Sequence, residues 1–341
     1  MIKRLAAVAI LVSFAGCERH SAVTAHSRWP VMGTVAAVSC ADPTADTEQL
    51  RQTADEIYRD SISRFSAWTD GSELAKINAS GTNWVAVSEE MAKLVEISIH
   101  YAKTSGGAFS PLVSPLLRVW GFGWKATPPD APPDGETVRK LAATARWENL
   151  SLNRPALTLR FTRPDAQLDL GGIAKGYAVD KVWERFRGIG VTNALVDLGG
   201  NLRCLGEAAP GRGGWRTAVR DPLSPAPGYI LGTFLLRPGE AVATSGNYER
   251  FVTIAGKRYA HIIDPRTGRP AEGVLSCTVI ADTAVAADAL STTLFVLGSN
   301  DGKEYLRKHA PDCAALWVTE SGEQILSDNF QTRNWQPARA R

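Results

Sequence analysis

The stretch Asp-Leu-Gly-Gly-Ile-Ala-Lys-Gly-Tyr-Ala-Val-Asp occupies residues 169–180 and decides the fold around it. Its glycines stand between a predicted strand and a predicted helix at residues 173–186. Backbone N–H groups at a helix start can bind phosphate, and glycine lets a ligand approach closely. The stretch is neither a Walker loop, which needs Gly-Lys-Ser/Thr, nor a Gly-x-Gly-x-x-Gly loop. Its spacing fits a tight strand–helix turn equally well, but Asp169 and Lys175 add a carboxylate and a cation that favour ligand binding.

The segments on either side of this stretch predict a mixture of strands and helices. Strands are predicted at residues 31–39, 157–161, 167–170, 194–198, 215–220, 229–236 and 278–281, with 157–161 and 167–170 forming a hairpin. Helices are predicted at residues 46–65, from the N-cap Ser88 to the glycines at 106–107, at 173–186, and at 283–297 with a stop at Gly298. A proline-rich segment at residues 127–135 predicts an exposed loop. No linker divides the chain, so we predict one compact unit of the α/β or α+β class.

Composition excludes several classes of protein. The chain has 341 residues, of which 44% are hydrophobic and 21% charged, and this excludes wholesale disorder. Its 38 Lys and Arg against 35 Asp and Glu give a net charge of +3, which is too small for a protein that binds nucleic acid by neutralising phosphates. No apolar run is long enough to span a bilayer.

The first residues have the pattern of a bacterial signal peptide. Lys3 and Arg4 precede an apolar stretch at residues 5–15, which is too short for a membrane span. The sequence Phe-Ala-Gly-Cys at residues 14–17 resembles a lipobox, in which the Cys is acylated and becomes the new N-terminus. An ordinary secretory signal that is cut elsewhere is the alternative. The predicted divisions of the chain are a signal peptide at residues 1–16, a lipidated Cys17 with a tether at residues 17–27, and a folded domain at residues 28–337.

Four further cysteines are spread along the chain, at Cys40, Cys204, Cys277 and Cys313. None lies in a Cys-x-x-Cys pair, so neither a zinc ribbon nor a redox dithiol is indicated. An oxidising compartment would permit disulfides, so disulfides and buried free thiols both stay open, with buried free thiols favoured.

Asp288 and Thr292 form a second feature with chemical meaning. They are four residues apart in a predicted helix, so both side chains point from one face. A carboxylate and a hydroxyl are hard oxygen ligands that suit Mg²⁺. Taken by itself, the pair could also be a polar stripe on the helix that has no function. The neighbouring residues are so apolar that the helix is predicted to be buried, however, and a buried Asp needs a partner such as a metal ion.

The third feature lies at residues 260–270, where His261 and Asp264 flank a short apolar pair before a Pro/Gly turn. The chain has 5 His, and one beside a turn is a candidate for proton transfer. A structural histidine next to a well-formed turn is the alternative.

Together these segments resemble the ApbE family, the FAD:protein FMN transferases. Each motif is short, but their common order along the chain makes the match specific. They lie at residues 32–34 (Met-Gly-Thr), 65–68 with 72–78, 107–111 with 117–123, 169–180, 196–200 (Val-Asp-Leu-Gly-Gly), 244–246 (Thr-Ser-Gly), 261–268 and 287–290 (Ala-Asp-Ala-Leu). A lipoprotein start is also typical of the family.

The resemblance implies a fold of mixed sheets with flanking helices and an FAD cleft between subdomains. It implies that the FMN half of FAD is transferred to a Thr hydroxyl of a partner protein, with release of AMP. Mg²⁺ would bridge pyrophosphate oxygens and stabilise the leaving group. Two alternatives stay open: an FAD pyrophosphatase that gives FMN and AMP, and a non-enzymatic FAD-binding lipoprotein. The pair Asp288 and Thr292 argues against the latter, because a carrier has less need of metal ligands.

The resemblance also implies roles for single residues. Asp288 and Thr292 correspond to side-chain metal ligands, and Gly172 to a backbone ligand. His261 is implied to be the base or to hold the flavin, and with Asp288 it is a catalytic candidate. The residues that would line the FAD site are Met32, Trp68, Ala108, Phe109, Ser110, Asp169, Lys175, His261 and Ile263. Ser110 stands where the family usually has Asp, and Trp68 replaces a common Tyr, which keeps a stacking surface but loses a hydroxyl.

The acceptor of the flavin is expected to be another protein. The family's acceptor motif, an Asp-x-x-Ser/Gly-Ala-Thr run, is absent from this chain. The resemblance implies a membrane-associated redox subunit of the Rnf, sodium-pumping quinone reductase or nitrous-oxide respiration type. We therefore expect a lipid-anchored protein at the periplasmic face of a bacterial membrane, with the inner membrane favoured and no nucleic-acid partner.

Overall fold

The computed structural model describes residues 25–123, 126–224, 228–248 and 250–338. The predicted signal peptide and the lipidation at Cys17 lie outside the described residues. Within them, no helix is both long enough and apolar enough to cross a membrane. Of the described cysteines, Cys204, Cys277 and Cys313 carry free thiols.

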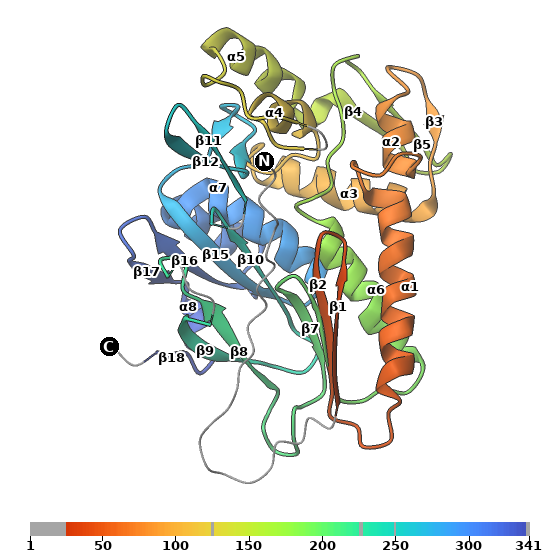
Figure 1. Ribbon diagram of the computed structural model, residues 1–341, viewed down its shortest axis with the longest axis vertical. Helices are drawn as coiled ribbons and strands as arrows, with labels where there is room; N and C mark the ends of the chain where they lie inside the picture. The colour runs from red at the N-terminus through yellow and green to blue at the C-terminus, as the bar shows by residue number, and fades with distance from the viewer. Residues whose placement is uncertain (1–24, 124–125, 225–227, 249, 339–341) are drawn as a thin grey trace.

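A central antiparallel sheet, eight-stranded within the described residues, organises the fold (Figure 1). In spatial order its strands are β1 (Ala25–Val31), β2 (Thr34–Cys40), β6 (Ala194–Leu198), β7 (Asn201–Leu205), β10 (Ala241–Gly246), β15 (Val274–Ala281), β16 (Ala314–Thr319) and β17 (Gln324–Leu326). Side chains alternate between its faces, since Ala241 and Ala243 belong to one core cluster and Val242 to another. Both faces are therefore covered.

Two long helices cover one face of this sheet. The helical segments are α1 (Thr47–Phe65), α2 (Glu73–Asn78), α3 (Glu89–Thr104), α4 (Ser114–Val119), α5 (Gly135–Thr144), the 3₁₀ turn η1 (Trp147–Asn149), α6 (Ala174–Gly188), α7 (Ala284–His309) and α8 (Asp328–Gln331). Helices α6 and α7 pack against each other and on β7, β10 and β15, while α1 lies alongside α6 (Figure 1). The contact between α6 and α7 is the part of the fold that matters for the site.

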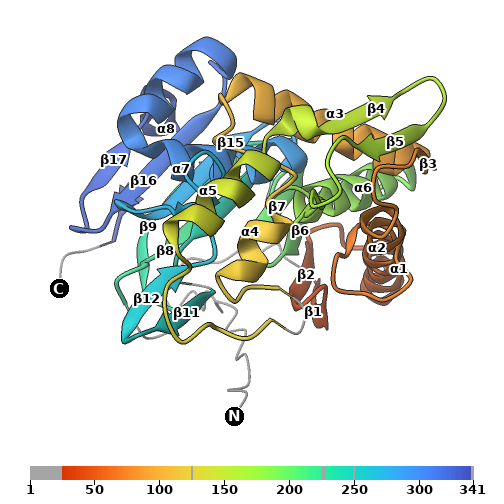
Figure 2. The ribbon, with the colours of Figure 1, turned by 90° about the horizontal axis from the view of Figure 1, so that it is seen from above.

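Smaller sheets complete the molecule. They are β3 (Val85–Ala86), β5 (Thr158–Phe161) and β4 (Leu150–Asn153); β18 (Gln336–Pro337), β9 (Ile230–Leu236) and β8 (Trp215–Arg220); and the hairpins β11 (Phe251–Ile254) with β12 (Lys257–Ala260) and β13 (Ile263–Asp264) with β14 (Arg269–Pro270). The β8–β9 sheet and α8 cover the other face of the central sheet. The β11–β12 hairpin packs with α4 and α5, on the same side of the molecule in Figure 2.

The mixed α/β class is confirmed, with a sheet that is antiparallel throughout its pairings. The predicted hairpin of residues 157–161 with 167–170 is wrong. Strand β5 pairs with β3 and β4 instead. The later segment has no strand partner, because the side chain of Asn78 bonds both the N–H and the carbonyl of Leu168. A side chain far away in sequence thus satisfies the backbone that the pattern assigned to a ladder.

Two predicted boundaries also differ. The single strand expected at residues 31–39 is a hairpin, β1–β2, whose turn holds Met32 and Gly33 at positive φ, and β1 begins at Ala25, inside the segment predicted as a tether. The helix expected to stop at Gly298 bends there, at φ 73°, and continues to His309. Glycine ends regular helical geometry at Gly298, as predicted, but the chain resumes the helix beyond it.

Candidate active site

The carboxylate of Asp288 lies at the beginning of helix α6, although it belongs to α7. Ile173, which precedes α6, makes no side-chain capping bond. The N–H of Gly176, in the first turn of α6, instead donates a hydrogen bond of 2.9 Å to Oδ2 of Asp288. Position 176 needs glycine, because a Cβ there would lie 2.1 Å from the carbonyl oxygen of Ala284. A carboxylate at a helix N-terminus also interacts favourably with the helix dipole.

A second set of polar groups surrounds the other oxygen of Asp288. Lys175 Nζ lies 3.3 Å from Oδ1. Asn201, on β7, is 2% exposed, and the two ends of its amide face the same oxygen and Lys175 Nζ. A carboxylate can only accept and an ammonium can only donate, so we assign the amide nitrogen as donor to Asp288 at 3.1 Å and the oxygen as acceptor from Lys175 at 3.0 Å. The burial predicted for Asp288 is confirmed, at 3% exposure, and both carboxylate oxygens have protein partners. These partners satisfy the buried carboxylate, so its burial alone does not require a metal ion.

Thr292 lies one helical turn beyond Asp288 on the side of α7 that faces α6. Its Oγ1 is 3.2 Å from Ser245 Oγ, and Ser245 also pairs with Ser291 Oγ at 2.8 Å. The loop before α6 reaches the same place, because a Cβ built on Gly172 would lie 3.3 Å from Thr292 Oγ1. The three residues that the resemblance implies as metal ligands thus meet where α6 and α7 join.

The oxygen atoms at this junction fit Mg²⁺ by their chemistry. Asp288 offers a carboxylate, Thr292 a hydroxyl and Gly172 a backbone carbonyl, and all three are hard ligands. Mg²⁺ is usually held by one or two carboxylates and keeps several waters. In the part of the chain that the structure describes, no group of three or more His, Cys, Asp or Glu could hold a metal ion. The fit therefore rests on oxygen ligands of different kinds.

His261 follows β12 directly, and Arg250 holds it in place. The carbonyl of Arg250 accepts a hydrogen bond from the N–H of His261 at 3.2 Å and lies 3.1 Å from its Nδ1. A carbonyl can only accept, so Nδ1 carries the proton and Nε2 is the basic nitrogen. Burial, followed by the positive charges of Arg250 and Lys175, lowers the pKa of His261 to about 4. The ring is therefore neutral at neutral pH, as a general base must be.

Arg250, which the sequence pattern did not single out, joins this histidine to other predicted site residues. Its guanidinium lies over the ring of Trp68, 5.1 Å from the centroid, and Trp68 is 41% exposed. A Cβ on Gly33, next to Met32 in the β1–β2 turn, would lie 3.9 Å from the same guanidinium. Burial raises the pKa of Asp169, and a hydrogen bond from the N–H of Gly171, followed by the charge of Arg250, partly offsets this. The predicted Trp68 and Asp169, and the turn that contains Met32, thus lie near one arginine.

The remaining predicted FAD residues, Ala108, Phe109, Ser110 and Ile263, are buried. The ring of Phe109 borders Gly172, where an added Cβ would lie 3.3 Å away. The hydroxyl of Ser110 donates to the carbonyl of Ala145 at 2.6 Å and accepts from the N–H of Leu112 at 3.0 Å. Ser110, where the family usually has Asp, therefore uses its side chain within the protein.

Sequence reasoning missed two residues of this site, Asn201 and Arg250. Asn201 directly follows the motif at residues 196–200, so extending that motif by one residue would have found it. Arg250 stands in no quoted motif, and its side chain meets Trp68 across a long separation in sequence. Nothing in its local spacing could have indicated this contact.

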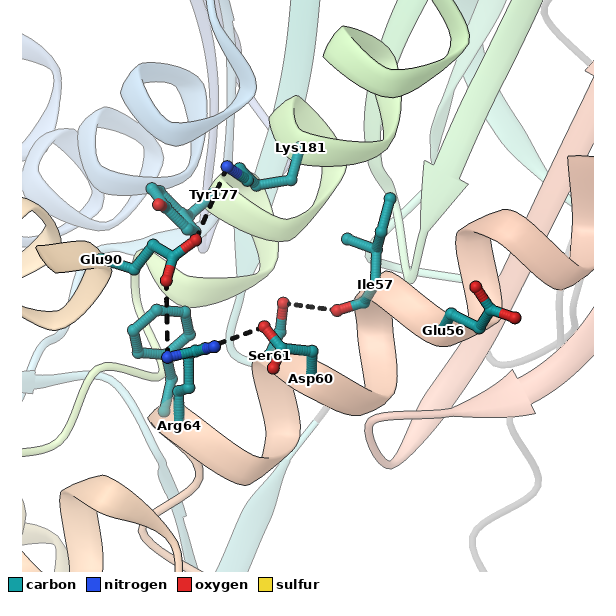
Figure 3. Close-up of a pocket in the computed structure, with 9 residues that line it drawn as sticks. Glu56, Ile57, Asp60, Ser61, Arg64, Glu90, Tyr177 and Lys181 are labelled. Carbon is teal, nitrogen blue, oxygen red and sulfur yellow. Dashed lines mark hydrogen bonds and ion pairs between the residues drawn. The ribbon is translucent and has the colours of Figure 1, made fainter. Parts of the chain in front are cut away.

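A cavity of about 260 Å³ lies elsewhere, on the side of α6 that faces α1 (Figure 3). Four of its charged groups pair with one another: Arg64 contacts Asp60 at 2.8 Å and Glu90 at 3.4 Å, and Lys181 contacts Glu90 at 3.7 Å. None of the predicted site residues lines it. The cavity is therefore separate from the junction around Asp288.

Comparison with known proteins gives a consistent result. A model of the ApbE family matches residues 32–317. An FAD:protein FMN transferase of Haemophilus influenzae is 32% identical over 333 residues, covering 94% of each chain. One from Rhodobacter capsulatus is 37% identical over 282 residues, which are 82% of this chain, but the chain spans only 51% of that relative.

Solved structures give the same picture. The crystal structure of an ApbE protein from Thermotoga maritima has a TM-score of 0.82 and 30% identity, covering 92% of this chain and 99% of the other. A flavin transferase ApbE from Vibrio cholerae has a TM-score of 0.77 and 30% identity, covering 91% and 98%. The chain is therefore similar, in sequence and in fold, to proteins several of whose names state a flavin transferase function.

Proposed function

Because this chain belongs to the ApbE family, we propose that it is an FAD:protein FMN transferase that moves the FMN half of FAD to a Thr hydroxyl of a partner protein and releases AMP. Flavin transferase is the function named for its relatives, which align over most of its length. Dependence on Mg²⁺, the Thr acceptor and the release of AMP are the finer parts of the proposal.

One observation carries the proposal: a carboxylate and a cation from distant segments are in contact, and a neutral histidine from a third segment lies within the electrostatic reach of that cation. Asp288 and Lys175 are in contact at 3.3 Å, and the charge of Lys175 also acts on the ring of His261. Transfer of a phosphoryl-type group between two oxygens needs these three things, because a pyrophosphate must be neutralised and a hydroxyl must lose its proton.

The chain's own residues supply the binding of FAD. Lys175 and Arg250 offer positive charge to the pyrophosphate, and the exposed face of Trp68 offers a surface for an aromatic ring. The glycines at residues 171–172 let a phosphate come close to the backbone before α6. We propose that FAD lies in a cleft between subdomains, with Arg250 and its neighbours Trp68 and Asp169 on one side and the α6–α7 junction on the other.

The chemical step is a displacement at phosphorus. The acceptor hydroxyl oxygen bonds to the phosphorus of the FMN half, the phosphoanhydride bond to AMP breaks, and its electron pair leaves on the AMP phosphate. The hydroxyl proton passes to Nε2 of His261, which is free to accept it because Nδ1 donates to Arg250. Binding of an anionic pyrophosphate raises the basicity of this ring again, since it offsets the two nearby cations.

Mg²⁺ held by Asp288, Thr292 and Gly172 would stabilise negative charge on the leaving phosphate. The protein keeps Asp288 in position for this, because Gly176 fixes one carboxylate oxygen and Lys175 contacts the other.

We also propose that the protein works at the periplasmic face of a bacterial membrane, with the inner membrane favoured. The signal sequence and the lipobox-like Phe-Ala-Gly-Cys at residues 14–17 support a lipid anchor on Cys17. The acceptor would then be a membrane-associated redox subunit facing the same compartment, of the Rnf, sodium-pumping quinone reductase or nitrous-oxide respiration type.

The decisive experiment is incubation of the pure protein with FAD, Mg²⁺ and candidate acceptor subunits, followed by the intact mass of each acceptor. We expect the mass of one FMN to be added to an acceptor Thr, together with one AMP in solution. Free FMN, formed at a rate that no acceptor increases, would identify an FAD pyrophosphatase instead. Tight binding of intact FAD with Mg²⁺ present would identify a carrier.

A further inference from the structure

Asn201 begins strand β7, directly after the two-glycine turn that joins β6 and β7. A hairpin of this kind needs glycine in the turn, where Gly199 and Gly200 have φ of 62° and 86°, but it does not need a polar side chain on the following residue. Asn201 is nevertheless 2% exposed, and its amide points at the α6–α7 junction. A buried polar group of this kind is costly unless it is bonded, so its partners decide what it does.

The partners of Asn201 are two groups of opposite charge. The amide orientation follows from these partners: with its nitrogen toward the carboxylate, it donates to Oδ1 of Asp288 at 3.1 Å, and its oxygen accepts from Lys175 Nζ at 3.0 Å. A carboxylate can only accept and an ammonium can only donate, so a bridge between them needs one donor and one acceptor on the same side chain. An amide provides both without adding charge, whereas Asp would add a negative charge and Leu would offer no polar atom.

We propose that Asn201 is a positioning residue of the divalent-cation site, and that by bridging Asp288 and Lys175 it sets the affinity of Asp288 for the cation. This rests on the proposed function, which makes Asp288 a metal ligand. Without the bridge, the ammonium of Lys175 moves closer to the carboxylate of Asp288. It then competes with the divalent cation for the lone pairs of that carboxylate. With the bridge, part of the hydrogen bonding of Lys175 is taken up by the amide oxygen.

Two substitutions of Asn201 test this, because the proposal expects effects of opposite sign. Asn201→Leu keeps the size of the side chain but removes the bridge, and we expect the affinity for Mn²⁺ alone to fall roughly tenfold, the usual scale for a bond to a charged group. Asn201→Asp adds a carboxylate beside Asp288, and we expect Mn²⁺ to bind roughly tenfold more tightly. Free Mn²⁺ is measured by electron paramagnetic resonance on the full-length protein without FAD, and FAD binding is measured separately.

Asn78 provides the matched control. Its side chain makes two hydrogen bonds to a segment distant in sequence, at Leu168, and neither of them involves Asp288 or Lys175. Asn78→Leu and Asn78→Asp should lower the melting temperature and leave the affinity for Mn²⁺ at the wild-type value. A purely structural role of Asn201 would give the same pattern, a lower melting temperature without opposite shifts in metal affinity.

The proposal is overturned if both Asn201 variants bind Mn²⁺ like the wild type, if both weaken it alike, or if the wild type binds no divalent cation. If Asn201→Leu does not fold, Lys175→Met tests the proposal instead. Removal of the competing ammonium should tighten Mn²⁺ binding. Unchanged or weaker Mn²⁺ binding in this variant would contradict the proposal. Failure of the proposed function would look different, since the wild type would then transfer no FMN to any acceptor, whatever its affinity for Mn²⁺.

Discussion

At the scale of single residues, Asp288 combines a structural role with a proposed chemical one, and two substitutions separate them. Asp288→Asn keeps an acceptor for the N–H of Gly176 but removes the charge, whereas Asp288→Ala removes both. We expect either change to abolish Mg²⁺-dependent FMN transfer, by at least about a hundredfold, while much of the FAD binding survives. Only Asp288→Ala should also cost stability, by about 1–2 kcal/mol, because a helix cap is lost.

The measurements are initial rates of transfer, FAD binding by fluorescence and thermal unfolding. Asp301→Ala is the control, since Asp301 is an exposed Asp on the same helix, beyond the bend at Gly298. Full activity in Asp288→Asn would remove the metal assignment.

The lowered pKa of His261 predicts how the free energy of unfolding depends on pH. Its pKa is lowered to about 4 in the folded chain, while an unfolded histidine titrates near 6.5. Between these values the unfolded chain binds more protons, so this residue lowers the free energy of unfolding as the pH falls from about 6.5 to about 4. The full shift corresponds to at most about 3 kcal/mol, and partial exposure of the ring reduces it.

The check is chemical unfolding at pH 7 and at pH 5 for the wild type and for His261→Gln. We expect the loss of stability on acidification to be smaller in His261→Gln by about 1–2 kcal/mol. His309→Gln, which changes an exposed histidine at the end of α7, should lose as much as the wild type. Equal losses in all three proteins would contradict the prediction.

Whether a site residue could be predicted from the sequence depended on how far away its interaction partner lies in the chain. Asp288 and Thr292 could be placed on one face because the helical period relates them directly. Asn201 and Arg250 could not be found in this way, because each acts through a side chain that is distant in sequence, Lys175 in one case and Trp68 in the other.

At the scale of elements, the close approach of α6 and α7 brings the site residues together, and it depends on one glycine. A Cβ on Gly176 would lie 2.1 Å from the carbonyl oxygen of Ala284 and 2.8 Å from Cβ of Asp288. Gly176→Ala should therefore push the helices apart, destabilise the protein by at least about 1–3 kcal/mol and reduce FMN transfer. Gly188 is the control, because it ends the same helix and a Cβ there meets nothing within 4 Å.

Gly188→Ala should be neutral or stabilise the protein by up to about 1 kcal/mol, since alanine is the better helix former. Unfolding free energies and transfer rates of the two variants test the prediction. Similar behaviour of Gly176→Ala and Gly188→Ala would show that α6 and α7 tolerate more separation than their packing indicates.

The four longest helices of the described residues, α1, α3, α6 and α7, and several strands follow from hydrophobic periodicity and end signals, whereas the shorter helices α2, α4, α5 and α8 were not predicted. The strand that was predicted wrongly and the turn that was missed both have physical explanations. The segment after β5 looks like a strand by composition, but Asn78 satisfies its backbone at Leu168. The β1–β2 turn was missed because Met32 adopts φ 50°, which a residue with a side chain rarely does.

At the scale of the whole molecule, a buried ion pair ties the site to the central sheet. Asp180, on α6, caps the N-terminus of α7 by accepting from the N–H groups of Ala284 and Val285 at 2.8 and 2.9 Å. Arg203, on β7, donates to Asp180 at 2.8 Å and to the carbonyl of Asp282 at 2.9 Å. Helix α7 contributes residues to three of the core clusters, so its position affects most of the molecule.

Breaking this pair should therefore unfold the protein as one unit and not loosen the site alone. Asp180→Asn can still accept a hydrogen bond but leaves the charge of Arg203 buried and unpaired, which typically costs about 3–5 kcal/mol. We expect one cooperative transition at a lower temperature, with FAD binding and tertiary structure lost together in calorimetry and fluorescence. Arg59→Ala breaks an exposed pair with Asp55 and should change stability by less than about 1 kcal/mol. Two separate transitions in Asp180→Asn would instead mean that the flavin site and the sheet can unfold independently, and that the chain is not a single folding unit.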